Sequence, residues 1–175
     1  ALHGPHAYPG SPFIAPAPLR KEDPLHLAEL HPQEHAALRD NPAQYKAKLY
    51  LQTGLDLRQA PTPPTPRRGL VLMDPSYELK QDYAEIPKAL TKVTRKWNVG
   101  SVMLWYPVLR SAAHTEMLAQ LEAIYPEGLR HEVVFPPAKE NHRMVGSGLF
   151  FINPPYGLMD ELDRLSFCFK KGQTQ

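Results

Sequence analysis

Short apolar segments of the kind that form β-strands alternate with helical patterns along most of this sequence. Six strands are expected, at residues 25–31, 46–51, 69–73, 101–108, 132–135 and 148–152. The segment 69–73, GLVLM, is apolar throughout, which is typical of a strand buried on both faces. Helices are expected at residues 32–40, 82–97 and 112–125. Strands that alternate with helices predict an α/β fold with a mainly parallel sheet.

Proline punctuates this pattern and accounts for 20 of the 175 residues, about twice its usual share of roughly 5%. The segment 60–66, APTPPTP, is expected to be a stiff, extended connector, because successive prolines favour polyproline II geometry. Near the start of the chain, a turn predicts a helix with Ser11 as its N-cap and Pro12 as its first residue. Pro16 and Pro18 should end that helix early.

The composition excludes several classes of protein. With 42% hydrophobic and 22% charged residues the chain can form a core, and its length suits one domain. A single cysteine, Cys168, cannot form an internal disulfide. His31 and His35 have helical spacing but no third ligand, so no metal site is expected. The sequence has no apolar run of roughly 18 residues and no signal-peptide pattern, which predicts a cytoplasmic protein without membrane contact.

Charge by itself says little about the partner, because the net charge is only +2. Basic groups that are either phosphate contacts or solvated surfaces are Arg67, Arg68, Lys92, Arg95, Lys96, Lys139, His142 and Arg143. Glu29 lies near the end of the strand at 25–31, where an acid commonly accepts hydrogen bonds from ribose hydroxyls. A solvated glutamate is the alternative interpretation.

The strongest candidate for chemistry is Asp74-Pro75-Ser76-Tyr77, directly after the strand at 69–73. Ligands of open α/β sheets bind outside the carboxyl ends of the strands, which is where this segment should lie. Asp74 could accept a hydrogen bond, and Tyr77 offers a flat ring to a base. The alternative is a plain strand-to-helix turn, in which Asp74 caps the helix and Pro75 is its first residue.

A second segment, Asn153-Pro154-Pro155-Tyr156, also follows an apolar strand. By its letters it is the closer match to the (Asp/Asn)-Pro-Pro-(Tyr/Phe/Trp) signature of amino-group methyltransferases. The strand before Asp74 comes in the middle of the chain, whereas the strand before Asn153 comes late, where edge strands usually lie. Because ligands bind where the central strands diverge, chain order favours Asp74.

Five segments in order, YPGSPFIA, LHLAELHP, RRGLVLMDPSYELKQDY, LWYPV and SGLFFINPPY, closely resemble the bacterial ribosomal RNA large subunit methyltransferase J family. Members of that family are similar to adenine-N6 methyltransferases that act on 23S rRNA with S-adenosylmethionine, and relatives have also been labelled as proteins for using external DNA. The resemblance implies a class I S-adenosylmethionine-dependent methyltransferase fold, which is Rossmann-like. It implies 23S rRNA as the partner, and it leaves the oligomeric state open.

The resemblance also implies roles for single residues. Asp74 matches the catalytic aspartate and also a cofactor-binding position, and Pro75 and Tyr77 match substrate-binding positions. The other implied cofactor-binding residues are Ser11, Glu29, Thr53 and Gly54. The implied mechanism is direct methyl transfer to an adenine amine that Asp74 and the Pro75 carbonyl orient, with the base stacked on Tyr77.

The chain departs from the family pattern at several places, including Pro16 and Pro18, which interrupt a helix, and the segment after Tyr156; three other departures concern the site and the sheet. Ser76 stands where a second proline is usual, and Thr53 stands where an acid is usual. The third departure is that residues 1–175 read as a single methyltransferase domain without the family's first strand, which is central in the strand order 3-2-1-4-5-7-6. The strands at 25–31 and 69–73 would then lack their shared neighbour and expose unpaired edges. Two other functions stay open, adenine-N6 methylation of DNA and nucleic-acid binding without catalysis.

Overall fold

The computed structural model describes residues 10–40, 47–55, 62–135 and 141–171. The chain forms two compact units, residues 1–60 and 61–175, and each is described by itself. The boundary falls at the start of the expected connector at 60–66, and residues 62–69 contain no helix or strand. The organisation of the chain as a single domain stays a prediction.

The first unit contains α1 (Ser11–Ile14), β1 (Leu25–Glu29), α2 (Pro32–Asp40) and β2 (Ala47–Leu51). β1 and β2 pair in parallel, with Leu25 opposite Ala47 and Glu29 opposite Leu51. A hydrogen bond of 2.9 Å joins His26 Nδ1 to the Tyr50 hydroxyl across the pair. The strands and the helix expected in this part of the chain are therefore confirmed.

The expected cap of α1 is wrong by one residue. Gly10 is the N-cap, because its carbonyl oxygen already accepts hydrogen bonds from the Phe13 and Ile14 amides at 2.9 and 3.2 Å. Ser11 is consequently the first helical residue, and its side chain makes no cap hydrogen bond. The helix ends at Ile14, before Pro16, as the prolines predict.

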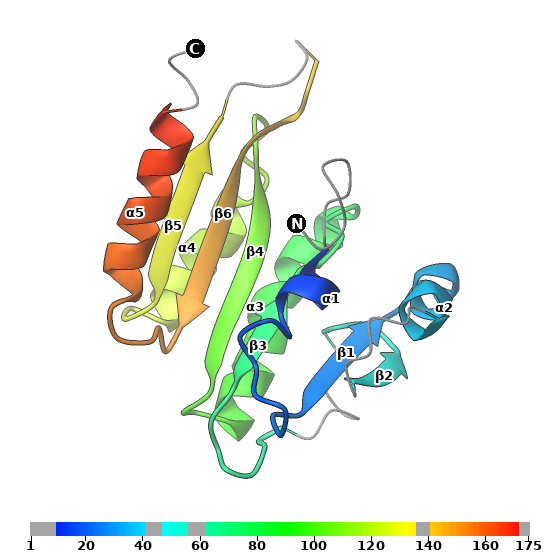
Figure 1. The fold of residues 1–175 in the computed structure, drawn as a ribbon. Coiled ribbons are helices and arrows are strands. Elements are labelled where there is room, and N and C mark those ends of the chain that lie inside the picture. The colour runs from blue at the N-terminus through cyan, green and yellow to red at the C-terminus, as the bar shows by residue number, and fades with distance from the viewer. Residues whose placement is uncertain (1–9, 41–46, 56–61, 136–140, 172–175) are drawn as a thin grey trace. The chain divides into compact units, whose positions relative to one another are not determined.

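The second unit contains β3 (Leu70–Met73), α3 (Lys80–Lys96), β4 (Ser101–Leu109), α4 (Thr115–Ile124), β5 (Leu129–Val134), β6 (Met144–Ile152) and α5 (Leu158–Lys171). Its sheet has the order β3-β4-β6-β5 (Figure 1). β3 and β4 are parallel, and β6 is antiparallel to both β4 and β5. Three of the four strands run in one direction, but two of the three pairings are antiparallel, so this sheet is mixed, whereas the β1-β2 pair is parallel. This order matches the 4-5-7-6 part of the implied strand order, and the β1-β2 pair matches its 3-2 part.

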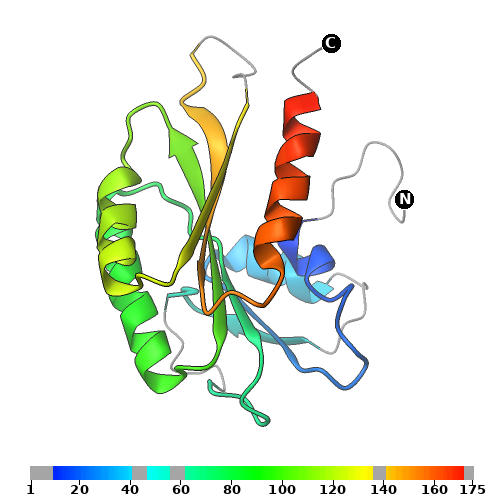
Figure 2. The ribbon, with the colours of Figure 1, turned by 90° about the vertical axis from the view of Figure 1, so that its left-hand side faces the viewer.

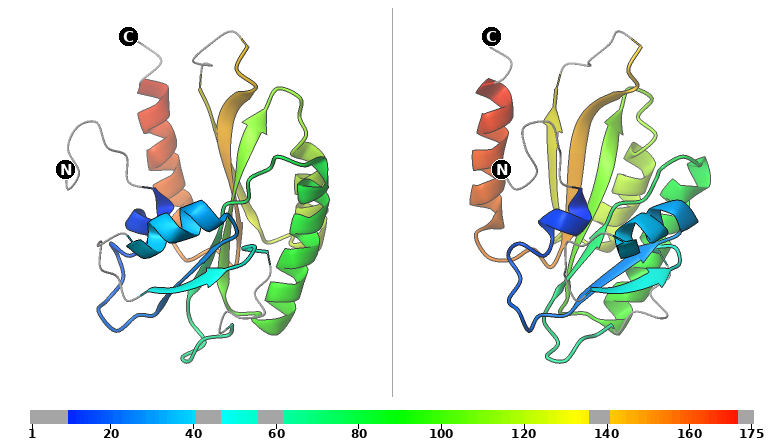
Figure 3. Two further views of the ribbon diagram at one scale, coloured as in Figure 1. Left: turned by 90° about the vertical axis from the view of Figure 1, so that its right-hand side faces the viewer. Right: turned by 45° about the vertical axis from the view of Figure 1, so that its right-hand side comes forward.

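Helices cover both faces of the second unit's sheet (Figures 2 and 3): α3 and α4 lie against one face and α5 lies on the other, beside β5. The core lies under α3 and α4, because alternate residues of β4 point there. Its fully buried large side chains are Ile86, Leu90, Val102, Leu104, Tyr106, Met117, Leu118, Leu121 and Phe150. Burial of one such side chain is worth about 1.5–3 kcal/mol.

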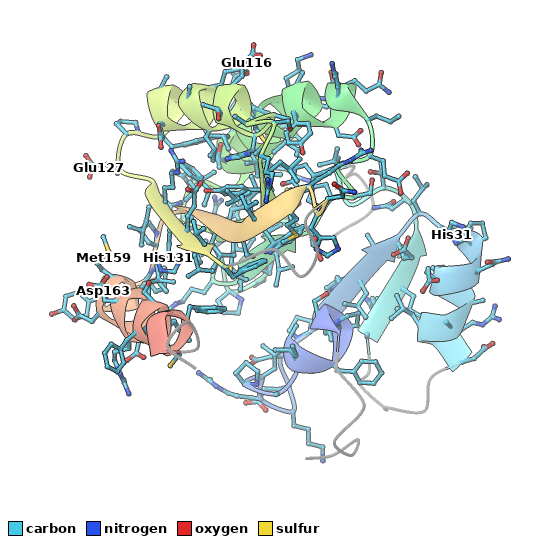
Figure 4. All side chains as sticks on the ribbon, turned by 90° about the horizontal axis from the view of Figure 1, so that it is seen from above. His31, Glu116, Glu127, His131, Met159 and Asp163 are labelled. Atoms are coloured by element: carbon cyan, nitrogen blue, oxygen red, sulfur yellow. The ribbon has the colours of Figure 1, made fainter. Side chains whose placement is uncertain are left out.

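On the opposite face, His131 of β5 lies at α5 (Figure 4), where its Nε2 is 2.7 Å from the Ser166 hydroxyl. This last helix was not predicted from the sequence. Its signal is the helical spacing of Leu158, Leu162 and Leu165, of which Leu162 is fully buried.

β3 does not have the burial expected for GLVLM. Leu70 and Leu72 are 58% and 39% exposed, whereas Met73 is buried. The expectation of two buried faces is wrong, because only the face toward α3 is covered. Along its edges, β3 pairs with one described strand, β4. Among the described strands, β1 pairs with β2 and β3 pairs with β4, so β1 and β3 belong to separate sheets.

Candidate functional site

The segment Asp74–Tyr77 lies at the carboxyl end of β3, the edge where ligands of α/β sheets bind. It does not begin a helix. The N-cap of α3 is Leu79, and its amide donates a hydrogen bond of 3.1 Å to the Asp82 carboxylate. The interpretation of Asp74 as a helix cap is therefore wrong, because the helix starts six residues after it.

Without a capping role, the Asp74 carboxylate is left free to bind a ligand. It makes no hydrogen bond or ion pair with any side chain or amide in the described part of the chain. Asp74 is an exposed residue, but neighbouring protein desolvates part of its carboxyl group, and this raises its pKa above the ordinary 3.8. An unpartnered acceptor in such surroundings is a candidate for a functional group.

Tyr77 is held rigidly beside Asp74. Its φ of 56° lies in the left-handed region. The hydroxyl donates a hydrogen bond of 2.6 Å to the Trp105 carbonyl of β4, and the side chain is 9% exposed. The ring centroid lies 5.0 Å from that of Tyr83 and 6.1 Å from that of Trp105. Burial and the neighbouring Tyr83 and Asp74 raise the pKa of the Tyr77 hydroxyl, so it stays protonated and keeps this bond.

Tyr83 adds a feature that was not predicted from the sequence. It lies in the first turn of α3, and its buried hydroxyl has no hydrogen-bond partner within the described ranges. The aromatic group behind Asp74 thus contains one hydroxyl that is bonded and one that is not. A tyrosine six residues after Tyr77 carries no special signal in the sequence, because only the packing of α3 on β4 shows which hydroxyl finds an acceptor.

Asn153 lies at the other end of the sheet. Because β6 is antiparallel to β4, Ile152 pairs with Val102 near the start of β4, whereas Met73 pairs with Leu104 farther along it. The Asn153 side-chain amide donates hydrogen bonds of 2.9 Å to the carbonyls of Asn98 and Gly100. Tyr156 of the same segment is fully exposed. Asn153 therefore holds the turn between α3 and β4 together, and its amide group is already engaged.

In the first unit, three of the expected cofactor residues lie at one edge. Glu29 ends β1, and Thr53 and Gly54 follow β2 at the same carboxyl edge of the parallel pair. One Glu29 carboxylate oxygen, Oε1, accepts the His31 amide at 2.7 Å, which orients the group and leaves Oε2 available. The Thr53 hydroxyl oxygen accepts the Leu55 amide at 3.3 Å, so its own proton is free to be donated. The space around the Gly54 α-carbon is open.

These two groups of residues are brought together separately, each within its own unit. The second unit joins Asp74 to Pro75 and Tyr77, and the first joins Glu29 to Thr53 and Gly54. An acid and a hydroxyl at a strand edge suit the hydroxyls and the base of a nucleoside, so this donor set fits the adenosine part of S-adenosylmethionine. Ser11, at the start of α1, is exposed.

The basic residues lie at several places. Arg67 donates a hydrogen bond of 3.3 Å to the Asn98 side chain, before the start of β3, and Lys139 lies outside the described residues. His142 and Arg143 line a cleft together with Arg110, which was not among the predicted basic groups although it follows the strand at 101–108 closely. Over the described ranges, no group of three or more metal-binding side chains is present, and no helix is long and apolar enough to cross a membrane.

Known proteins resemble most of this chain. The family model "Ribosomal RNA large subunit methyltransferase D, RlmJ" matches residues 4–172. Two proteins named ribosomal RNA large subunit methyltransferase J, from Escherichia coli (strain K12) and Haemophilus influenzae, are 35% and 36% identical over 90% of this chain. A crystal structure of a protein from Legionella pneumophila is 37% identical, with a TM-score of 0.83 over 92% of this chain. The chain spans 57% of the length of the two named relatives and 60% of the solved one.

Proposed function

Because the chain belongs to the ribosomal RNA large subunit methyltransferase J family, we propose that the protein transfers a methyl group from S-adenosylmethionine to N6 of an adenine in 23S rRNA. The family's name specifies methyl transfer to ribosomal RNA. The proposal adds 23S rRNA as the substrate and the adenine amine as the methyl acceptor. The cytoplasm, where ribosomal RNA is available, is the proposed compartment.

The observation that carries the proposal is the free Asp74 carboxylate beside the fixed ring of Tyr77, at the carboxyl end of β3. An adenine amine is a weak nucleophile, because its lone pair is delocalised into the ring. Acceptors that hold its two hydrogens at the carboxylate of Asp74 and the carbonyl of Pro75 would align the nitrogen with the methyl donor. Tyr77, held by Trp105, would supply a rigid wall for the base.

Methyl transfer to the amine needs a group that can accept a proton from its nitrogen. As the new N–C bond forms and the S–C bond breaks, the nitrogen becomes acidic and one proton must leave. A partly desolvated carboxylate of raised pKa accepts a proton more readily than an ordinary aspartate, which supports Asp74 in this role. When bound, S-adenosylmethionine supplies an electrophilic methyl group, and Ser11, Glu29, Thr53 and Gly54 are the residues proposed to hold it.

The test compares Asp74→Asn with Glu78→Gln in the full-length protein. Both changes replace a carboxylate by an amide of the same shape, four residues apart, and Glu78 is exposed. We expect Asp74→Asn to slow methyl incorporation into protein-free 23S rRNA by about 10²–10³-fold, the usual loss for one preorganised electrostatic group. Glu78→Gln should retain the normal rate. A normal rate in Asp74→Asn would remove Asp74 from the mechanism.

Two further arms separate the alternatives. Methyl incorporation into duplex DNA in place of rRNA would indicate the DNA enzyme. RNA binding without any binding of S-adenosylmethionine by calorimetry would indicate a binding protein without catalysis.

A further inference from the structure

A cleft of about 570 Å³ opens beyond the carboxyl end of β4. The residues that line it are Leu109, Arg110, Ser111, Asn141, His142 and Arg143. These come from two segments, one that follows β4 and one that precedes β6. Two of the six side chains are guanidinium groups, and three of the others carry polar groups.

The backbone brings the two arginines together. β4 and β6 pair up to Leu109 and Met144, and the register shifts between Val108 and Leu109. Beyond that irregularity, the Arg110 amide donates a hydrogen bond of 3.0 Å to the Arg143 carbonyl. Irregularities of this kind redirect side chains and are common beside functional sites. Residues 33 positions apart in the sequence are thus fixed next to each other at the end of the ladder.

Both arginines are exposed and have no ion-pair partner among the residues that the structure describes. Three other arginines of the chain differ in this respect. Arg39 is paired with Asp40, Arg130 with Glu122 and Glu132, and Arg164 with Glu161. Two adjacent guanidinium groups without a carboxylate repel each other, and an anion between them relieves that repulsion. Arginine is also the side chain best suited to bind phosphate through two parallel hydrogen bonds.

The cleft lies on the same edge of the sheet as Asp74 but not at the same place. β3 and β4 are parallel, and Met73 pairs with Leu104, so Asp74 lies level with Trp105. Arg110 is five residues farther along, which at roughly 3.3 Å per residue is about 17 Å. One base cannot reach both positions, whereas the backbone of a single RNA strand can.

We propose that Arg110 and Arg143 form a subsite that binds a phosphodiester of the RNA strand flanking the target adenine. The proposal rests on the proposed function, and it adds where the substrate backbone runs: from Asp74 along the direction of β4 and across its end. Phosphate contacts of this kind set the register of a nucleic acid and not the identity of the base. The subsite therefore contributes to RNA affinity and positioning, and not to the methyl-transfer step.

The test measures binding of the full-length protein to protein-free ribosomal RNA at increasing salt. The double variant Arg110→Ala/Arg143→Ala is expected to bind roughly tenfold more weakly near 0.1 M salt. Its plot of log affinity against log salt should be shallower by about 0.7 for each phosphate that the variant no longer neutralises. KM for RNA should rise by the same factor while kcat stays unchanged. Arg110→Lys/Arg143→Lys should restore the salt slope, because the charges remain.

Arg20→Ala/Lys21→Ala is the matched control. It also removes two adjacent, exposed positive charges, but these belong to the first unit, between α1 and β1, and are not among the candidate phosphate contacts. An equal loss of affinity in this control would overturn the proposal, because any loss of charge would then have the same effect. So would an unchanged salt slope in Arg110→Ala/Arg143→Ala.

Two results separate the subsite from related explanations. If inorganic phosphate binds the wild-type protein at these arginines while Arg110→Ala/Arg143→Ala binds RNA as tightly as the wild type, the cleft is a site for free phosphate and the proposal fails. If the wild-type protein binds RNA through this cleft but transfers no methyl group, the subsite stands and the proposed function fails. If the double variant methylates RNA normally and its salt slope is unchanged, the proposed function stands and the subsite is refuted.

Discussion

Removal of one hydroxyl from either of two neighbouring tyrosines should have opposite effects on stability. Tyr77 and Tyr83 lie in ring contact, and each is 9% exposed. The Tyr77 hydroxyl donates to the Trp105 carbonyl at 2.6 Å, whereas the buried Tyr83 hydroxyl has no partner in the described part of the molecule. Replacement by phenylalanine keeps the ring and removes only the hydroxyl, so the two variants differ in that one hydrogen bond.

The expected magnitudes follow from this difference. A buried hydroxyl without a hydrogen bond costs about 1–3 kcal/mol of folding free energy on the basis of protein mutants. Tyr83→Phe should therefore leave the free energy of unfolding unchanged or raise it by up to that amount. Tyr77→Phe breaks a hydrogen bond and leaves a carbonyl of β4 without this donor, which should lower the free energy of unfolding by about 1–3 kcal/mol.

Urea denaturation followed by tryptophan fluorescence measures this difference. The chain has two tryptophans, Trp97 and Trp105, and both belong to the second unit, so the signal reports on the unit that contains the tyrosines. For a slope of about 1–3 kcal/mol per molar urea, a change of 1 kcal/mol moves the midpoint by roughly 0.3–1 M. The exposed Tyr156 gives the control Tyr156→Phe, which should not move the midpoint.

A fall in the midpoint of Tyr83→Phe as large as that of Tyr77→Phe would refute this reasoning. It would mean that the Tyr83 hydroxyl has an acceptor in the folded protein. A change in the slope would instead point to an altered unfolded state, and the comparison would then rest on Tyr77→Phe and Tyr156→Phe alone.

Two further predictions concern Asn153 and Asp74. Asn153→Ala should lower the free energy of unfolding by about 1–3 kcal/mol, since two hydrogen bonds to backbone carbonyls are removed, while methylation per folded molecule stays normal. Reduced methylation per folded molecule would contradict its structural role. Because folding raises the pKa of Asp74, the folded state holds this proton more tightly, and stability should fall as pH rises from 3.8 through the raised value. In Asp74→Asn, the urea midpoint should no longer show the share of this pH dependence that comes from Asp74. The methylation rate of the wild-type protein should fall when the solution is made acidic, with an apparent pKa above 3.8.

Much of the fold was predictable because its signals are local. Alternating and continuous apolar segments identified all six strands of the described residues, and proline predicted the early end of α1 at Ile14. α5 was not predicted, although Leu158, Leu162 and Leu165 have helical spacing. The cap of α1 was misplaced because glycine at position 10 is also a good N-cap, and side-chain preference alone does not decide between neighbouring residues.

The candidate site was predictable only in part. The sequence predicts that Asp74 follows a strand. It does not show that Asp74 is no helix cap, because this depends on where α3 begins. Burial of β3 was misjudged because an apolar strand has the same letters whether one or both of its faces are covered.

The sequence by itself determined the order of strands and helices, the place of Asp74 after β3, and the resemblance to a methyltransferase family, because each rests on neighbouring residues. The tertiary structure decided which ends of the strands meet. The antiparallel direction of β6 puts Asn153 at the edge opposite Asp74, and the same pairing puts Arg143 beside Arg110. Such long-range placements follow from strand direction and register, which are set by the packing of whole elements and not by the residues at either site.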